Sequence, residues 1–89
     1  MTFMFNTLKM WVFLSLLNMN PEHLKHRACF QDKSRGTLYF LLKIDHPVME
    51  SWILVSEFNH HWISPQSTPI DAFGGVGWLD TFEFVKICE

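Results

Sequence analysis

Two runs of alternating side chains limit the folds open to this chain more than any other feature. Within residues 37–45 (TLYFLLKID), apolar side chains occupy every second position, namely Leu38, Phe40, Leu42 and Ile44. Residues 51–59 (SWILVSEFN) alternate in the same way, with Trp52, Leu54 and Phe58 on one face. A period of two is typical of a β-strand, so both runs are predicted to be strands. Their connection of about five residues is short enough for an antiparallel hairpin.

A further strand is predicted at the C-terminal end, where residues 80–88 (DTFEFVKIC) alternate again. Residues 64–78 are predicted to form a long loop before it. Pro65 and Pro69 lack the N–H group that a sheet ladder requires, and the run Gly74-Gly75-Val76-Gly77 favours turns. Residues 37–88 are therefore expected to build an antiparallel sheet of three to four strands that contains this loop.

The first twenty residues (MTFMFNTLKMWVFLSLLNMN) are mostly apolar, and Lys9 is their one charged side chain. No polar stripe continues through residues 10–17, so the pattern does not fit an amphipathic surface helix. An apolar helix over residues 1–19 is expected to be buried at an interface, anchored in a membrane, or removed as a secretory signal. The interfacial helix is favoured, because the run is short for a membrane span and lacks a signal-type cleavage site.

Pro21 ends this first segment, and a second helix, short and basic, is predicted over residues 21–29. Asn20 is a suitable cap for its first turn, and residues 31–36 are predicted to form a turn. The whole chain, residues 1–89, is then a single small α+β domain. Its N-terminal helix and its short second helix pack on the antiparallel sheet.

The low charge content bears on the class of partner. Of the 89 residues, 48% are hydrophobic and 18% are charged, with a net charge of −2. About 25% charged residues is usual, and a small domain leaves much of its surface unburied. Apolar surface is therefore expected to face a protein partner or another copy of the chain, and residues 1–19 leave a membrane possible. Nucleic acid is an unfavourable partner, because the chain has no basic excess for phosphate.

Histidines and cysteines suggest a weak metal or thiol site. On a helix His23 and His26 would be neighbours and could share a metal ion with His60 and His61. Cys29, beside basic residues, could act as a thiolate nucleophile. A solvated helix face and a structural thiol are the simpler interpretations, so no catalytic residue and no cofactor is predicted. Whether Cys29 pairs with Cys88 stays open, because the spacing does not decide it.

Large aromatic and aliphatic side chains are the candidates for a contact surface, because tryptophan is enriched in binding hot spots. The predicted interface residues are Trp11, Phe13, Leu14, Leu17, Trp62 and Trp78.

The leading functional prediction is a small non-enzymatic binding or accessory protein that docks on a protein partner or self-associates. The first alternative is a membrane-anchored or exported protein that uses residues 1–19. The second is a metal- or thiol-dependent enzyme at His23, His26 and Cys29 with His60 and His61. A chain without a selected function is a further alternative, and the compartment is left open between cytoplasm and membrane.

Overall fold

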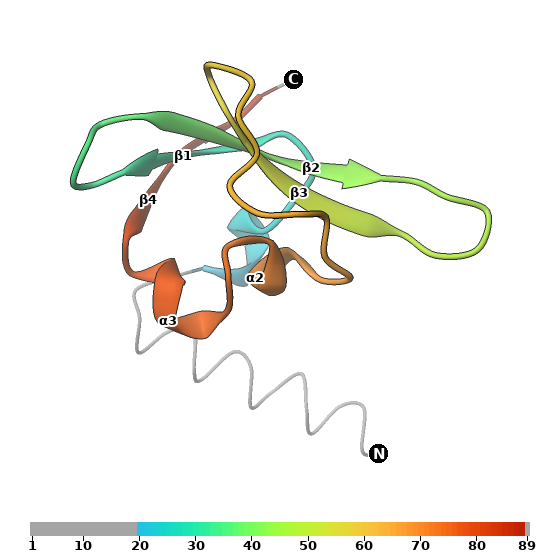
Figure 1. Ribbon diagram of the computed structural model, residues 1–89. Helices are drawn as coiled ribbons and strands as arrows, with labels where there is room; N and C mark the ends of the chain where they lie inside the picture. The colour runs from blue at the N-terminus through green and yellow to red at the C-terminus, as the bar shows by residue number, and fades with distance from the viewer. Residues whose placement is uncertain (1–19, 89) are drawn as a thin grey trace, which may run out of the picture.

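The computed structural model of the protein describes residues 20–88. Within them a four-stranded antiparallel sheet carries two short helices on one face, α2 (Pro69–Ala72) and α3 (Val76–Leu79) (Figure 1). This confirms the small α+β class and the antiparallel sheet. The apolar helix predicted over residues 1–19 lies outside the described residues. Across residues 20–88, no helix is long and apolar enough to cross a membrane.

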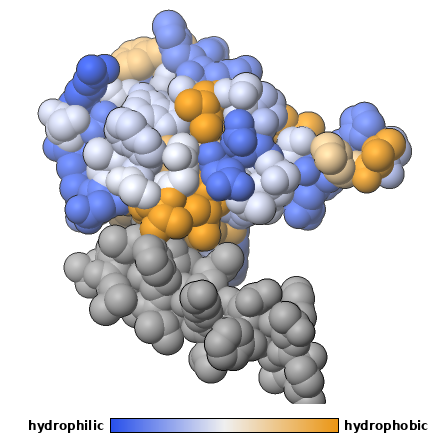
Figure 2. All heavy atoms as spheres, turned by 60° about the horizontal axis from the view of Figure 1, so that its bottom comes forward, coloured by the Kyte–Doolittle hydropathy of each residue, from blue (hydrophilic) through white to orange (hydrophobic). Residues whose placement is uncertain are grey.

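The predicted hairpin is present. Its strands are β2 (Leu38–Ile44) and β3 (Ser51–Ser56), which run antiparallel with Leu41 opposite Leu54. The C-terminal strand is present as β4 (Phe82–Ile87). The connection between β2 and β3 projects from the body of the protein, and Figure 2 shows hydrophobic surface at this projecting end.

The prediction of a helix over residues 21–29 is wrong. Only a single 3-10 turn forms there, η1 (Pro21–His23). Asn20 does cap this turn, because its side-chain oxygen accepts a hydrogen bond from the Glu22 N–H across 2.9 Å. The remainder of the segment is drawn into the sheet, so tertiary pairing overrides its local helical preference.

β1 (Ala28–Asp32) is the strand that replaces the end of this helix and the start of the predicted turn. It pairs with β2 on one side and β4 on the other, which gives the sheet the order β3-β2-β1-β4. The consecutive residues Ala28, Cys29 and Phe30 are all buried. A strand buried on both faces has no polar alternation, so its sequence does not show a period of two.

Two short helices interrupt the predicted loop over residues 64–78. They are α2 (Pro69–Ala72) and α3 (Val76–Leu79). Thr68 caps α2, since its hydroxyl oxygen accepts from the Asp71 N–H across 3.2 Å, and a proline takes the first helical position. A proline fits there because the first N–H groups of a helix have no partner within the helix.

The hydrophobic core lies between these helices and one face of the sheet, which we call the core face. Its largest fully buried side chains include Phe30, Leu41, Leu54, Phe73 and Leu79. The rings of Phe30 and Phe73 meet edge to face with their centroids 4.9 Å apart. Burying a side chain of this size stabilises a fold by about 1.5–3 kcal/mol, so this layer is the main source of stability.

The chain that follows β3 covers the outer edge of that strand. Trp52 and Gln66 exchange two main-chain hydrogen bonds of 2.6 and 2.8 Å, and the Trp62 N–H donates to the Leu54 oxygen across 2.8 Å. The β3 edge therefore has partners within the chain, which protects it from adding a foreign strand.

The opposite side of the sheet, which we call the outer face, receives the apolar side of β2. Tyr39 and Leu41 belong to the core, so the residues that alternate with them point the other way. These outward residues are Leu38, Phe40, Leu42 and Ile44. Neither α2 nor α3 lies on this side of the sheet (Figure 1). The more apolar face of β2 is therefore the outer face, and not the face that packs against α2 and α3.

Candidate functional site

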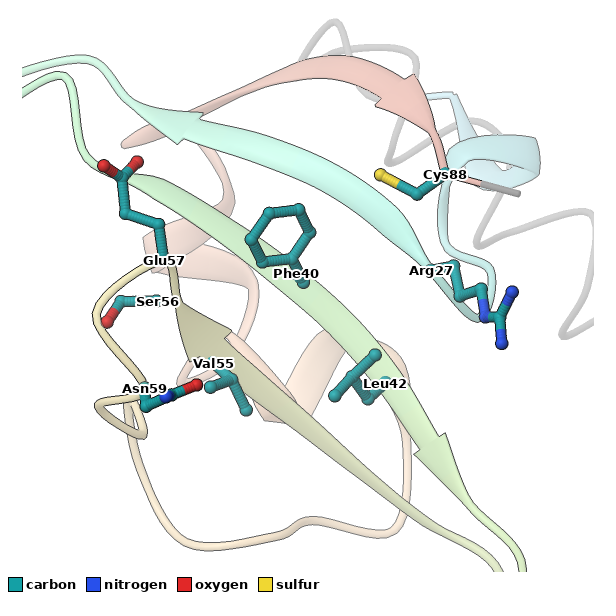
Figure 3. Close-up of a pocket in the computed structure, with 8 residues that line it drawn as sticks. All are labelled: Arg27, Phe40, Leu42, Val55, Ser56, Glu57, Asn59 and Cys88. Carbon is teal, nitrogen blue, oxygen red and sulfur yellow. The ribbon is translucent and has the colours of Figure 1, made fainter.

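A hollow on the outer face is the candidate site. It has a volume of about 250 Å³ and is open to solvent. Figure 3 shows Phe40 near its centre, with Glu57 and Arg27 on opposite sides. The residues that line the hollow are Arg27, Phe40, Leu42, Val55, Ser56, Glu57, Asn59 and Cys88.

Two neighbouring strands supply the apolar floor of this hollow, with Phe40 and Leu42 from β2 and Val55 from β3. Phe40 in β2 lies opposite Cys29 of β1 and opposite Val55 of β3. Directly opposed side chains of antiparallel strands share a face, so these three form a row across the sheet. Leu42 and Ile53 form the next row. The middle of the outer face is therefore apolar, with Phe40, Leu42 and Val55 partly exposed and with Cys29 and Ile53 buried.

Opposite charges mark the two ends of the hollow. The main-chain N–H of Arg27 donates to the main-chain oxygen of Leu41 across 2.7 Å, which places Arg27 at one end. At the other end the Glu57 N–H donates to the Leu38 oxygen at 2.8 Å, and a Glu57 carboxylate oxygen accepts from the Leu38 N–H at 2.9 Å. Leu38 and Leu41 are about 10 Å apart along a strand. Arg27 and Glu57 are exposed and make no ion pair within the described part of the chain.

Strand β4 repeats this polarity. Its exposed Glu83 lies beside Gln31, and its exposed Lys86 lies beside Cys29. The register of β1 on β2 puts Glu83 toward the acidic end of the outer face and Lys86 nearer the basic end. The outer face is thus acidic at one end, apolar in its middle and basic toward the other end.

A tight turn after β3 positions Glu57 and Asn59 at the rim. Asn59 has a φ of 63°, in the left-handed region that asparagine tolerates better than most residues. The Ser56 hydroxyl oxygen accepts from the N–H groups of Phe58 and His60 at 3.2 and 3.0 Å. Because Ser56 is buried, the last residue of β3 fixes the shape of this turn.

Two free cysteines belong to the outer face. Cys29 is buried, whereas Cys88 is partly exposed and lines the hollow. Burial raises the pKa of the Cys29 thiol, and the nearby Cys88 thiol raises it further, while Lys86 acts in the opposite direction. A thiol that attacks a dissolved substrate requires a lowered pKa, so this environment disfavours Cys29 as the nucleophile of a thiol-dependent enzyme.

The four histidines of the predicted metal site are held in different surroundings. The His23 ring stacks on Phe84 with centroids 3.6 Å apart, and the His26 Nδ1 atom accepts from the Lys43 N–H across 2.9 Å. His60 and His61 are exposed in the turn region after β3. Between residues 20 and 88, no three His, Cys, Asp or Glu side chains lie close enough to hold a metal ion.

Of the predicted interface residues, the structure describes two. Trp62 is half-buried, packs edge to face on Tyr39 and Phe82, and donates from its indole Nε1 to the Phe73 oxygen at 2.8 Å. It therefore has a role within the fold. Trp78 touches Trp62 and is 48% exposed. The other predicted interface residues, Trp11, Phe13, Leu14 and Leu17, lie outside the described residues.

The outer-face hollow is the feature that the sequence did not reveal. The alternation in residues 37–45 separates the two faces of β2 correctly, but it does not say which of them the helices cover. The unpredicted strand β1 lies beside the hollow, with Cys29 opposite Phe40, and Cys88, the residue after β4, lines it. Both placements depend on the pairing of β1 with β2 and β4, and pairing between distant segments leaves no local signal in the sequence.

Comparison with known proteins gives no relative for this architecture. No protein-family model matches the chain, and no curated protein and no solved structure matches it significantly.

Proposed function

We propose that this protein is a small non-enzymatic binding protein that pairs with a second copy of itself through the outer face of its sheet. The observation that supports this proposal is the outer face itself, which is apolar in the middle and oppositely charged at its two ends. Neither feature is needed to build the core, because the core forms on the other side of the sheet.

The apolar middle supplies the driving force for association. A sheet face that contacts water normally carries polar side chains, whereas the outward positions of β2 are all apolar. Phe40, Leu42 and Val55 are partly exposed around the hollow. Removing apolar surface from water contributes about 25 cal/mol per Å², so covering this face favours a complex.

The charges favour a second copy as the occupant. Two such faces can pack against each other around a two-fold axis that lies in the interface and crosses the strands near Phe40. This symmetry sets Arg27 of each copy against Glu57 of the other, so that each end of the face meets its complement. Closed two-fold dimers are the commonest homo-oligomers, and one self-complementary surface is all that they require.

No described contact favours the other two functions. The membrane-anchored or exported protein rests on residues 1–19, outside the described chain. The metal- or thiol-dependent enzyme rests on His23, His26 and Cys29 with His60 and His61. His23 and His26 contact different partners, Phe84 and the Lys43 N–H group. Cys29 is buried, and His60 and His61 are exposed after β3.

Sedimentation velocity across a dilution series tests the proposal. We expect the wild-type chain to pass reversibly from monomer to dimer over about 1–500 µM, a range typical of a modest interface. The substitution Val55→Lys should raise the dissociation constant at least about tenfold, because it places an unpartnered ammonium group in the apolar middle.

Val48→Lys is the matched control, because Val48 is 84% exposed in the connection between β2 and β3. This variant should dimerise like the wild type, and thermal unfolding should show that both variants are folded. A wild-type chain that stays monomeric throughout the series would overturn the proposal. Equal weakening by the two substitutions would also overturn it.

A further inference from the structure

We infer that Cys29 and Cys88 are a redox-controlled pair that closes into an intramolecular disulfide, with a small-molecule disulfide as the oxidant. This inference goes beyond the proposed self-association and does not depend on it. Both cysteines are free in the structure.

The register of β1 and β4 brings the two thiols together. Cys29 lies opposite Lys86, and Cys88 follows two residues later on the same face of the sheet. The Cys88 N–H donates to the Arg27 oxygen across 2.8 Å, so the pairing of the strands continues to this residue. Diagonal neighbours have Cα atoms about 7–8 Å apart, which is just beyond the upper limit of about 6.8 Å for a disulfide, so closure needs a small movement of the backbone.

The chain around Cys88 can make the small movement that closure needs. The β1–β4 ladder is irregular between Cys29 and Phe30, and such bulges increase the local twist of a strand pair. Cys88 follows Ile87, the last residue of β4, so the ladder does not hold it on both sides. Figure 3 shows its side chain directed over the outer face of the sheet.

The two thiols differ in exposure, and this difference sets the order in which they react. Cys88 is partly exposed and lines the open hollow, so a dissolved disulfide reaches it first. Cys29 is 1% exposed, and burial raises the pKa of its thiol, so it is a poor target for the same reagent. Cys29 therefore acts second and only within the molecule.

The chemistry is two successive thiol–disulfide exchanges. The deprotonated sulfur of Cys88 attacks the oxidant, forms a mixed disulfide and expels the first small-molecule thiolate. The deprotonated sulfur of Cys29 then attacks the Cys88 sulfur of that mixed disulfide and expels the second thiolate. Two protein thiols are oxidised to one disulfide, and the oxidant is reduced to two thiols that take up the released protons.

Oxidised glutathione and intact-mass spectrometry provide the test. After incubation at a concentration where the chain is monomeric, wild-type protein should be lighter by two hydrogen atoms and carry no adduct. Proteolytic peptides should contain Cys29 joined to Cys88. Because this bridge spans 59 positions, the oxidised protein should also unfold at a temperature roughly 5–20 °C higher.

Two variants distinguish the order of events. Cys29→Ser should keep a stable glutathione adduct on Cys88, whereas Cys88→Ser should stay unmodified while it is folded. Wild-type protein that ends as a mixed disulfide, or as a disulfide-linked pair of chains, would overturn the inference. These results use the mass of the single chain, so they stand whether or not the chain dimerises.

Discussion

The indole Nε1–H of Trp62 donates to the main-chain oxygen of Phe73 across 2.8 Å, and it joins the segment on the β3 edge to the end of α2. Phe73 is fully buried, so its oxygen depends on this partner. We expect Trp62→Phe to lower the free energy of unfolding by about 1–3 kcal/mol, because it leaves a buried acceptor unpaired. Urea unfolding at neutral pH measures the change.

Trp78→Phe is the control for this prediction, because the Trp78 side chain is about half exposed beside Trp62. Its cost should stay below about 1 kcal/mol, as expected for a substitution at an exposed aromatic ring. Equal losses in the two variants would show that the hydrogen bond to Phe73 has no special weight.

Replacement by alanine should have opposite effects on the free energy of unfolding at Gly74 and at Gly77. Gly74 has a φ of 103°, and a Cβ atom there would lie 2.8 Å from the Trp78 ring. Gly74→Ala should therefore cost about 1–3 kcal/mol in the free energy of unfolding. Gly77 lies in α3 with nothing within 4 Å of an added Cβ, so Gly77→Ala should be neutral or stabilise by up to about 1 kcal/mol. Thermal unfolding of the pair checks both signs, and a loss of stability in Gly77→Ala would contradict this account.

Asp32 should make stability depend on acid pH. One of its carboxylate oxygens accepts from the Ser34 hydroxyl at 2.8 Å and from the Ser34 N–H at 2.9 Å, and these bonds lower the pKa of Asp32. The stabilisation is therefore present above the pKa of an unfolded aspartate, about 4. It is lost as the pH falls from there through the lower pKa of the folded state.

The matching variant is Asp32→Asn. Because the amide cannot ionise, the free energy of unfolding of this variant should fall less than that of the wild type between about pH 4 and pH 2. Urea titrations at several pH values measure the difference. Asp45→Asn, whose side chain is 89% exposed in the native protein, should follow the wild type. A parallel decline of Asp32→Asn and wild type would remove Asp32 as a source of the pH dependence.

The strands that could be predicted from the sequence are those in which apolar and polar side chains alternate. The strands β2, β3 and β4 each have one apolar face that the sequence displays, and all three were predictable. Strand β1 was not, because burial of Ala28, Cys29 and Phe30 removes the polar half of the pattern. The helix α2 had a local signal in Thr68 followed by proline, although the loop prediction gave more weight to the prolines as sheet breakers.

The candidate site was harder to predict than the fold. Phe40 and its apolar neighbours are visible in the sequence, but their exposure depends on which face of the sheet receives α2 and α3. Arg27 and Glu57 reach the ends of one hollow because β1 and β3 both pair with β2. Such placement follows from pairing between distant segments, and a single sequence carries no local mark of it.

A charge-reversal experiment tests the two-fold dimer most directly. At low ionic strength, Arg27→Glu and Glu57→Lys should each weaken self-association about tenfold, because every exposed ion pair across the interface becomes a repulsion. An equimolar mixture of the two variants should form a mixed dimer about as stable as the wild-type dimer, since both pairs are then attractive again. Sedimentation velocity of each variant and of the mixture measures the dissociation constants. A mixture that associates no better than its separate components would contradict the pairing of Arg27 with Glu57 across a two-fold axis.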